Sequence, residues 1–345
     1  MSINVAVIGC GYWGPNLIRN FYENPEVELS YVCDLMPEKL AKLARRYPTI
    51  KLTNSYEEVL KDPKVNAVVI VTPVFTHFKL AKEALLAGKH VLVEKPMCST
   101  SAECHELVAL AEEKGLTLMV DHTFVYHGAV RKIKQEIDHG DFGDVVYFDS
   151  TRINLGLHQN DVNVVWDLAP HDLATMDFLI NSNPVSVHAT GASHIGNGIE
   201  DIAYLSLTLE NGVIAHLNVS WLSPVKIRRI LIGGTKKMVV YDDLDPAEKI
   251  KIYDKGIKSD EPQTSEGRHE RLIQYRIGDM RAPVFDMSEA LKTEVQHFVD
   301  CIKNKTTPVT DGRAGLRVVK ILEASNLSLK TGQPQSLEAM AGKVK

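Results

Sequence analysis

The most informative residues for the fold are Val5-Ala6-Val7-Ile8-Gly9-Cys10-Gly11-Tyr12-Trp13-Gly14, near the start of the chain. A short apolar run ends in a G-x-G-x-x-G motif, and residues 15–22 then follow a helical pattern. In such a turn the first glycine allows a tight bend, the second lets a pyrophosphate approach the backbone, and the third lets the helix pack on the strand. The motif predicts a dinucleotide-binding strand–turn–helix unit.

One acidic residue supports this prediction. Asp34 ends the next apolar stretch, residues 27–33, about 20 residues beyond Gly14, where a carboxylate can bind the ribose 2′-hydroxyl. Because a carboxylate repels a 2′-phosphate, the sequence predicts NAD as the cofactor, with NADP less favoured. The alternative, a glycine-rich turn followed by an unrelated helix-capping aspartate, explains less of the pattern.

The rest of the first third alternates strand and helix patterns. Apolar runs recur at residues 67–71, 90–93 and 116–120, and capping boxes start helices at Ser55–Glu58 and Thr100–Glu103. Such alternation is typical of a parallel sheet with helices on both faces. We therefore predict a doubly wound Rossmann domain over residues 1–122.

A different pattern follows residue 145. Residues 201–209 and 213–221 alternate apolar and polar side chains around an Asn211-Gly212 turn, which predicts an antiparallel hairpin. Residues 123–345 are therefore expected to form a substrate and oligomerisation domain, with an open, mainly antiparallel sheet and flanking helices. We expect a surface loop at 259–281 and closing helices near 288–304 and 312–331, which could pack back on the first domain.

Composition excludes several classes of protein. The 345 residues include 39 basic and 44 acidic side chains, a net charge of −5, which disfavours nucleic-acid binding. No apolar run reaches the ~18 residues that a membrane span needs, and no signal peptide is evident at the start. The five cysteines show no C-x-x-C spacing, which favours free thiols in a cytoplasmic protein over disulfides or a metal site.

Two further motifs carry candidate chemistry. Lys95, in Glu94-Lys95-Pro96, follows an apolar strand at the sheet edge where α/β folds bind ligands, and it could reach a substrate hydroxyl. His171 is expected near the start of a helix opened by Pro170, where it could accept a proton, with Asp167 orienting its ring. The plainer alternatives are a solvated lysine and helix-capping aspartates. The sequence leaves open which of Lys95 and His171 accepts the proton.

Taken together, these motifs resemble the glucose–fructose oxidoreductase / inositol dehydrogenase / rhizopine-catabolism (Gfo/Idh/MocA) family over nearly the whole chain. The resemblance rests on the glycine motif, Thr72-Pro73 with His77, Glu94-Lys95-Pro96, the Asp167-x-x-x-His171 spacing and the later antiparallel pattern. Trp166-Asp167-Leu168-Ala169-Pro170-His171 looks most like members from nucleotide-sugar pathways. Members of the family often have a run of small residues just before this aspartate, whereas this chain has Asn163-Val164-Val165-Trp166 there. The difference concerns the identity of the substrate and not the chemistry.

The resemblance implies nicotinamide-dependent oxidation of a secondary alcohol of a sugar, nucleotide-linked sugar or cyclitol, or the reverse reduction. Lys95 and His171 would be the catalytic pair with Asp167 beside them, all three contacting substrate, and the bond before Pro96 would be cis. Thr123 would lie near the nicotinamide. The implied cofactor site comprises Gly9, Gly11, Tyr12, Trp13, Gly14, Asp34, Thr72, Pro73, His77, Glu94, Lys95 and His122.

Other readings stay open. A non-catalytic dinucleotide-binding sensor or subunit is disfavoured by the intact Lys95 and His171 pair, and an imine or C=C reductase would need less of a general base. Basic residues of the second domain could contact an acidic or phosphorylated sugar, although each alone is expected to be a solvated strand residue: Arg152, His158, Lys226, Arg228 and Arg229. We also expect a homodimer or homotetramer through the second sheet, because Tyr204, Leu207 and Leu217 cannot all point inward.

Overall fold

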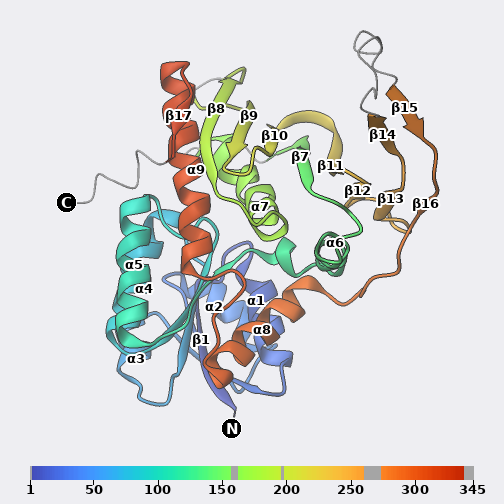
Figure 1. Ribbon diagram of the computed structural model, residues 1–345. Coiled ribbons are helices and arrows are strands. Elements are labelled where there is room, and N and C mark those ends of the chain that lie inside the picture. The colour runs from blue at the N-terminus through green and yellow to red at the C-terminus, as the bar shows by residue number, and fades with distance from the viewer. Residues whose placement is uncertain (1, 157–161, 196–197, 260–272, 338–345) are drawn as a thin grey trace, which may run out of the picture.

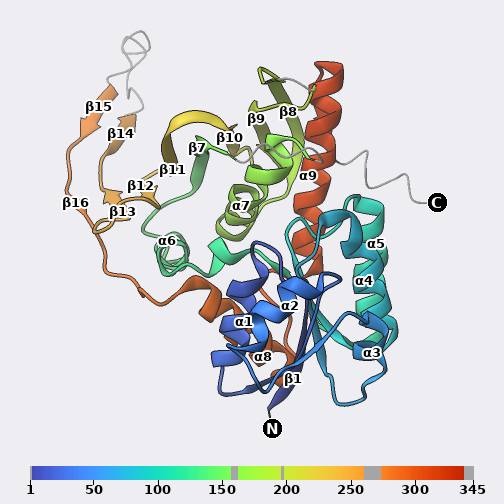
Figure 2. The same cartoon turned by 180° about the vertical axis from the view of Figure 1, so that it is seen from behind.

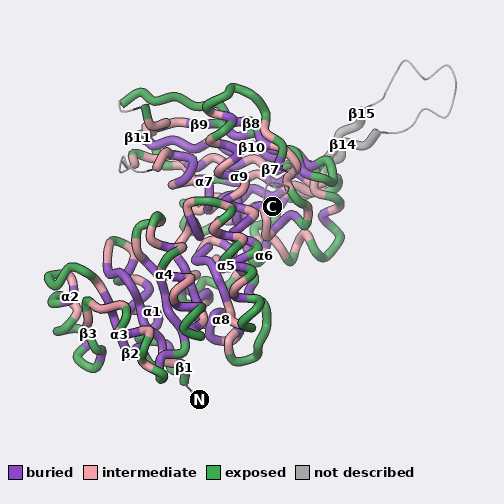
Figure 3. The backbone as a smooth tube through the Cα atoms, turned by 90° about the vertical axis from the view of Figure 1, so that its left-hand side faces the viewer, coloured by how far each residue is buried: buried purple, intermediate pink, exposed green. Residues whose placement is uncertain are grey.

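The computed structural model describes residues 2–156, 162–195, 198–259 and 273–337. Within these ranges the chain forms a six-stranded sheet, a nine-stranded sheet and a two-stranded ribbon. The two larger sheets lie in separate bodies, one above the other in Figure 1. Figure 3 shows buried segments running through both bodies, with exposed loops at the outside.

The first sheet is parallel throughout, with strand order β3-β2-β1-β4-β5-β6. This is the order of the doubly wound dinucleotide fold, so the predicted fold class is confirmed. The sequence pattern missed β3, because three residues are too short to show a period. The strands are β1 (Ile3–Ile8), β2 (Val27–Cys33), β3 (Lys51–Thr53), β4 (Ala67–Ile70), β5 (His90–Glu94) and β6 (Leu118–Asp121).

Helices connect these strands, and their first turns follow from local sequence. Thr100 and Glu103 form the complete capping box that the sequence predicts, whereas Ser55 accepts only the Glu58 N–H. The Glu58 carboxylate instead accepts a hydrogen bond from Thr53. The helices are α1 (Gly14–Glu23), α2 (Pro37–Ala44), α3 (Tyr56–Lys61), α4 (Val74–Leu86) and α5 (Ser101–Lys114).

The second sheet has the order β16-β13-β12-β11-β7-β10-β9-β8-β17. Only the β7–β10 pair is parallel among its described strands. Its strands are β7 (Val145–Leu155), β8 (Pro184–Ala192), β9 (Ile202–Leu209), β10 (Ile214–Ser220), β11 (Leu222–Gly234), β12 (Met238–Asp242), β13 (Ile250–Tyr253), β16 (Met280–Arg281) and β17 (Gln335–Ser336). Short helices η1 (Thr123–Tyr126) and α6 (Gly128–Asp138) lead into it.

The expected surface loop at 259–281 is wrong in part. β14 (Gly256–Ser259) pairs with β15 (Ile273–Arg276) in a ribbon that projects from the body in Figure 2, and β16 joins the main sheet. These strands have two to four residues each, too few for an alternating pattern to stand out in the sequence. Residues 260–272 of the expected loop lie outside the described residues.

Helices α7 (Val164–Leu179) and α9 (Gly312–Thr331) cover one face of the second sheet. The expectation that Tyr204, Leu207 and Leu217 cannot all point inward is confirmed, but through Tyr204 alone. Tyr204 is 45% exposed, whereas both leucines are fully buried. Side chains alternate along a strand, so Tyr204 and Leu207, three residues apart, must face opposite sides. Leu217 lies opposite Leu205 in the neighbouring strand and shares its buried face.

Of the two closing helices, α8 (Ala290–Asn304) packs on the first body and α9 contacts both bodies. α8 packs on α1, and Arg19 on α1 lies 2.6 Å from the Glu289 carboxylate just before α8. α9 contacts α5 and β6 of the first body and β8 and α7 of the second, and Figure 1 shows it alongside both. No helix in the described ranges is long and apolar enough to cross a bilayer.

A buried ion pair ties the second sheet to its covering helix. Arg152 on β7 and Asp172 on α7 are 4% and 1% exposed, and Arg152 donates from both Nε and Nη2 to the Asp172 carboxylate. The Nη2–Oδ1 distance is 2.7 Å. Because both charges have left water, each depends on the other for compensation.

We expect Asp172→Ala to lower the free energy of unfolding by about 3–5 kcal/mol, because it leaves the Arg152 charge buried and unpaired. The control is Glu57→Ala on α3. Glu57 pairs with Lys61, and both side chains are 74% exposed, so this change should leave the free energy of unfolding nearly unchanged. Denaturant unfolding of both variants gives the comparison, and equal losses would contradict the argument.

Candidate active site

A cleft of about 710 Å³ runs between the two bodies at the carboxyl edge of the first sheet. This edge is where doubly wound folds bind ligands. The first body contributes the glycine-rich turn and the ends of β5 and β6, while the second contributes α7 and parts of β7 and β11. Seven residues that the sequence predicts for the site line it: Tyr12, Trp13, Glu94, Lys95, Thr123, Asp167 and His171.

The glycine-rich turn has the geometry that its three glycines predict. Gly9 has φ +98°, and a Cβ there would lie 2.3 Å from the Val71 carbonyl oxygen. A Cβ on Gly14 would lie 2.5 Å from the Gly9 oxygen, so strand and helix could not pack as closely. At Gly11 nothing lies within 4 Å of that position. The turn therefore leaves bare backbone beside the α1 N-terminus, which fits a pyrophosphate.

Asp34 holds the end of β2 against this turn. Its Oδ2 accepts the Cys10 N–H at 2.8 Å, and its Oδ1 accepts the Met36 N–H at 2.9 Å. Burial raises the pKa of Asp34, but these bonds and the nearby Lys39 ammonium lower it by more. The net pKa of Asp34 therefore lies below its usual value. An ionised carboxylate thus stands where a ribose hydroxyl would bind.

Lys95 points from the end of β5 toward α7. Its ammonium donates to the Asp167 backbone oxygen at 3.1 Å and lies 3.9 Å from the Asp167 carboxylate. The Lys95–Pro96 bond is cis, which confirms that prediction. Glu94 accepts the Lys95 N–H, and burial raises the pKa of Glu94 well above its usual range. The backbone of Lys95 is therefore bonded to Glu94, while its ammonium contacts Asp167.

Trp221, which the sequence analysis missed, holds Asp167 from the other side. Its indole Nε1 donates to Asp167 Oδ2 at 2.9 Å, and its side chain is 1% exposed. Gly156 packs against the indole so closely that a Cβ there would lie 2.3 Å from it. An aromatic residue at the end of an apolar strand resembles ordinary core in the sequence, so no local signal marks it.

His171 lies within α7 rather than near its start. The helix begins at Val164, where the Asn163 side chain accepts the Trp166 N–H, and Pro170 lies inside it. The expected start at Pro170 is therefore wrong, because the asparagine cap precedes it. The four-residue spacing still puts Asp167 and His171 on one face of the helix. Burial, followed by the charges of Lys95 and Arg152, lowers the pKa of His171 well below its usual value.

Other predicted residues lie away from the cleft. His77 is buried, with its ring nitrogens 2.9 Å from the Pro96 oxygen and 2.7 Å from the Thr72 oxygen, and so it links the turns after β4 and β5. His122 lines a separate cavity of about 10 Å³, and burial lowers its pKa to about 3. Arg152 is buried against Asp172. His158 lies outside the described residues.

The comparisons with known proteins agree with this geometry. An NAD-binding Rossmann-fold domain of the oxidoreductase family matches residues 3–122, and the Gfo/Idh/MocA C-terminal domain matches residues 130–240. The chain belongs to the Gfo/Idh/MocA family. It is an oxidoreductase, and the resemblance inferred from its motifs is confirmed.

Individual members of the Gfo/Idh/MocA family match over nearly the whole chain. UDP-N-acetylglucosamine 3-dehydrogenase from Acidithiobacillus ferrooxidans is 28% identical, over 92% of this chain and 95% of its own. Its solved structure has a TM-score of 0.81 at 27% identity and covers 96% of this chain and 98% of that one. The scyllo-inositol 2-dehydrogenase (NAD(+)) of Bacillus subtilis is 26% identical, over 98% and 97% of the two chains.

Several cleft residues of this Gfo/Idh/MocA member were not singled out as site residues from sequence. Asp121 accepts hydrogen bonds from the Trp13 indole at 3.0 Å and the Thr123 hydroxyl at 2.5 Å, so it fixes the glycine-rich turn over β6. Phe124 and Asp243 also line the cleft. Among the described side chains, no group of three His, Cys, Asp or Glu residues is arranged to hold a metal ion.

Proposed function

We propose that the protein oxidises a secondary alcohol of a sugar, nucleotide-linked sugar or cyclitol to the ketone, or catalyses the reverse reduction. One observation carries the proposal: an ammonium from the dinucleotide-binding body and a neutral histidine from α7 line the same cleft. Relatives named as dehydrogenases of a nucleotide sugar and of an inositol support the substrate class.

The cofactor would lie along residues 1–122, and residues 123–345 would hold the substrate. The bare backbone at Gly11 and the carboxylate of Asp34 fit the pyrophosphate and the ribose of NAD. A nicotinamide bound there supplies the hydride acceptor for the alcohol carbon. Trp13 and Glu94 line the adjoining part of the cleft and would exclude water from it.

In the proposed mechanism His171 accepts the hydroxyl proton, because its lowered pKa keeps the imidazole neutral at pH 7. Lys95 donates a hydrogen bond to the same oxygen and stabilises the negative charge that develops there. The contacts of Asp167 with Lys95 and Trp221 suit it to position the ammonium. We assign it this role in place of orienting the His171 ring.

Variants of the two catalytic candidates test the mechanism. His171→Ala should lower kcat about 10²–10⁴-fold, as expected when a positioned base is lost, with NAD affinity nearly unchanged. In the wild type, activity should fall as the pH drops through the His171 pKa, which lies below 6.5. This acidic limb should disappear in His171→Ala and persist in Lys95→Met, although Lys95→Met should lose at least as much rate.

Rate against pH, measured with NAD and a panel of sugars and cyclitols, is the readout. Full activity of His171→Ala would end the assignment. The same panel separates the other readings, since a sensor would bind NAD without turnover. An imine or C=C reductase would leave every alcohol unchanged.

Asp34 should set the preference for NAD over NADP. Asp34→Ser removes the carboxylate that repels a 2′-phosphate, so the ratio of the two dissociation constants should move toward one while binding persists. Glu38→Gln is the control, because Glu38 is exposed on the first turn of α2. Fluorescence titration of both cofactors gives the constants, and equal affinities in the wild type would contradict the prediction.

We further propose a homodimer or homotetramer built on the second sheet. The face opposite α7 and α9 exposes Tyr204, Ile214 and His216, with the Tyr204 and His216 rings stacked at 6.1 Å. Burying such a face in a second copy would remove this apolar surface from water. Light scattering at micromolar concentration should show an oligomer, and Ile214→Arg should shift it toward monomer. A wild-type monomer would refute the proposal.

The proposed location is the cytoplasm. All five cysteines are buried, free thiols, as suits a reducing compartment.

A further inference from the structure

One end of the cleft is lined by residues of the second body. Arg228 on β11, Asp243 just after β12, and His127 before α6 line it together with Phe124. The mechanism proposed above uses none of these four side chains. Arg228 also contradicts the sequence expectation of a solvated strand residue, since only 30% of its side chain is exposed.

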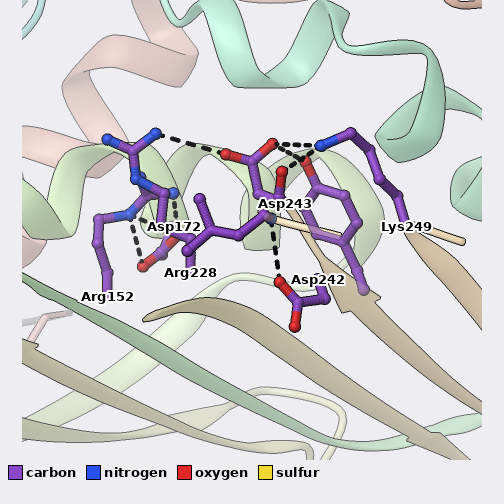
Figure 4. A network of polar contacts seen from close by, with 8 residues as sticks. Arg152, Asp172, Arg228, Asp242, Asp243 and Lys249 are labelled. Carbon is purple, nitrogen blue, oxygen red and sulfur yellow. Dashed lines mark hydrogen bonds and ion pairs between the residues drawn. The ribbon is translucent and has the colours of Figure 1, made fainter. Parts of the chain in front are cut away.

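At this end the cations Arg152, Arg228 and Lys249 contact the carboxylates of Asp172 and Asp243 (Figure 4). Arg152 is fully engaged by Asp172. Asp243 is shared, because the Arg228 guanidinium lies 3.4 Å and the Lys249 ammonium 3.6 Å from its oxygens. Three cations therefore face two carboxylates, which leaves one positive charge uncompensated.

Neighbouring groups do not cancel this charge. Asp242 is the cross-strand partner of Arg229, not of Arg228, and its carboxylate accepts the Leu244 N–H. Burial raises the pKa of Asp243, but Lys249, the Tyr241 hydroxyl and Arg228 lower it by more. Its net pKa lies below the usual value, so Asp243 is ionised and is already one of the two carboxylates counted above. Burial lowers the pKa of His127, which is therefore neutral.

Hydrogen-bond donors at this end are also in surplus. A guanidinium has five N–H groups, yet the one bond of Arg228 among the described residues is the 3.4 Å contact with Asp243. Its Nε is buried with no partner there. His127 Nδ1 accepts a hydrogen bond from the Ala129 N–H at 3.1 Å. The proton of the neutral ring therefore lies on Nε2, which is a further donor.

Phe124 connects this end to the reacting groups. The Arg228 guanidinium lies 5.7 Å from the centre of the Phe124 ring, and the His171 ring lies 5.0 Å from it. One aromatic side chain thus separates the surplus cation from the proposed base. One small molecule can therefore place an anionic group at Arg228 and its alcohol at His171.

We propose that Arg228 is a specificity residue that binds an anionic substituent of the substrate, a carboxylate or a phosphate, with His127 as a second donor. This inference rests on the proposed function and narrows it to acidic sugars, sugar phosphates or nucleotide-linked sugars over neutral sugars and cyclitols. Charge-assisted bonds from a guanidinium to planar or tetrahedral oxyanions give this selectivity.

Calorimetric titration of the NAD-loaded protein tests the proposal directly. The ligands are matched sets for glucose, galactose and N-acetylglucosamine: the neutral sugar, its uronic acid, its 1-phosphate and its UDP derivative. At least one anionic ligand should bind ten or more times as tightly as its neutral counterpart. A preference confined to uronic acids identifies a carboxylate subsite, and one confined to phosphorylated ligands identifies a phosphate subsite.

Arg228→Gln should erase this preference, weakening the anionic ligand about tenfold to a hundredfold and leaving its neutral counterpart unchanged. Arg228→Lys keeps the positive charge and should therefore retain part of the preference for the anionic ligand. That result would show that the loss in Arg228→Gln is not caused by misfolding. Arg229→Gln removes the same charge from the next position of β11, on the opposite face, and should bind like the wild type once its oligomeric state is checked.

Equal binding of neutral and anionic ligands, or equal losses for both in Arg228→Gln, would overturn the inference. NADH formation is read separately on the same panel. Turnover of neutral sugars without anion preference would refute the inference alone. Anion-selective binding through Arg228 without turnover of any alcohol would refute the proposed function but would still support the anion-binding subsite at Arg228.

Discussion

The contact between Lys95 and Asp167 is the interaction on which the site depends. Lys95 comes from the parallel sheet and Asp167 from the helix that covers the second sheet, and their 3.1 and 3.9 Å contacts span the cleft. Trp221 fixes the far oxygen of the aspartate, so the ammonium is held from the second body rather than left to solvent. Because His171 lies one helical turn further on, whatever holds Asp167 also places the base.

Burial shifts the pKa values of two groups that line the cleft. It raises the pKa of Glu94 and lowers that of His171, while Arg152 and Asp172 compensate each other as a buried ion pair. The Lys95 ammonium contacts the Asp167 carboxylate, and a developing oxyanion would be a second partner for it. These groups need no rearrangement during the reaction as long as the two bodies keep their relative position. α9 contacts both bodies and so can hold them in that position.

Local motifs were readable from the sequence, and contacts between distant segments were not. Gly9, Gly11 and Asp34 lie within one strand–helix–strand unit, β1-α1-β2, so their spacing suffices to predict them. The helix start at Pro170 was misplaced because the proline outweighed the cap at Asn163. Trp221 reaches Asp167 and Arg228 reaches the cleft only because β10 and β11 flank β7 on either side, and one strand's sequence does not contain that arrangement.

The same distinction between local motifs and contacts of distant segments applies to the residues that select the substrate. The departure from the family pattern at residues 163–166 invites a substrate role, yet Asn163 caps α7 and bonds Glu200 and Asn326, and its neighbours are buried core. Those residues shape the helix rather than the cleft. Arg228, by contrast, lines the cleft beyond Phe124 and is absent from the contacts that hold Lys95, Asp167 and Trp221. A change at Arg228 can therefore alter which molecule is bound while the proton-transfer geometry stays fixed.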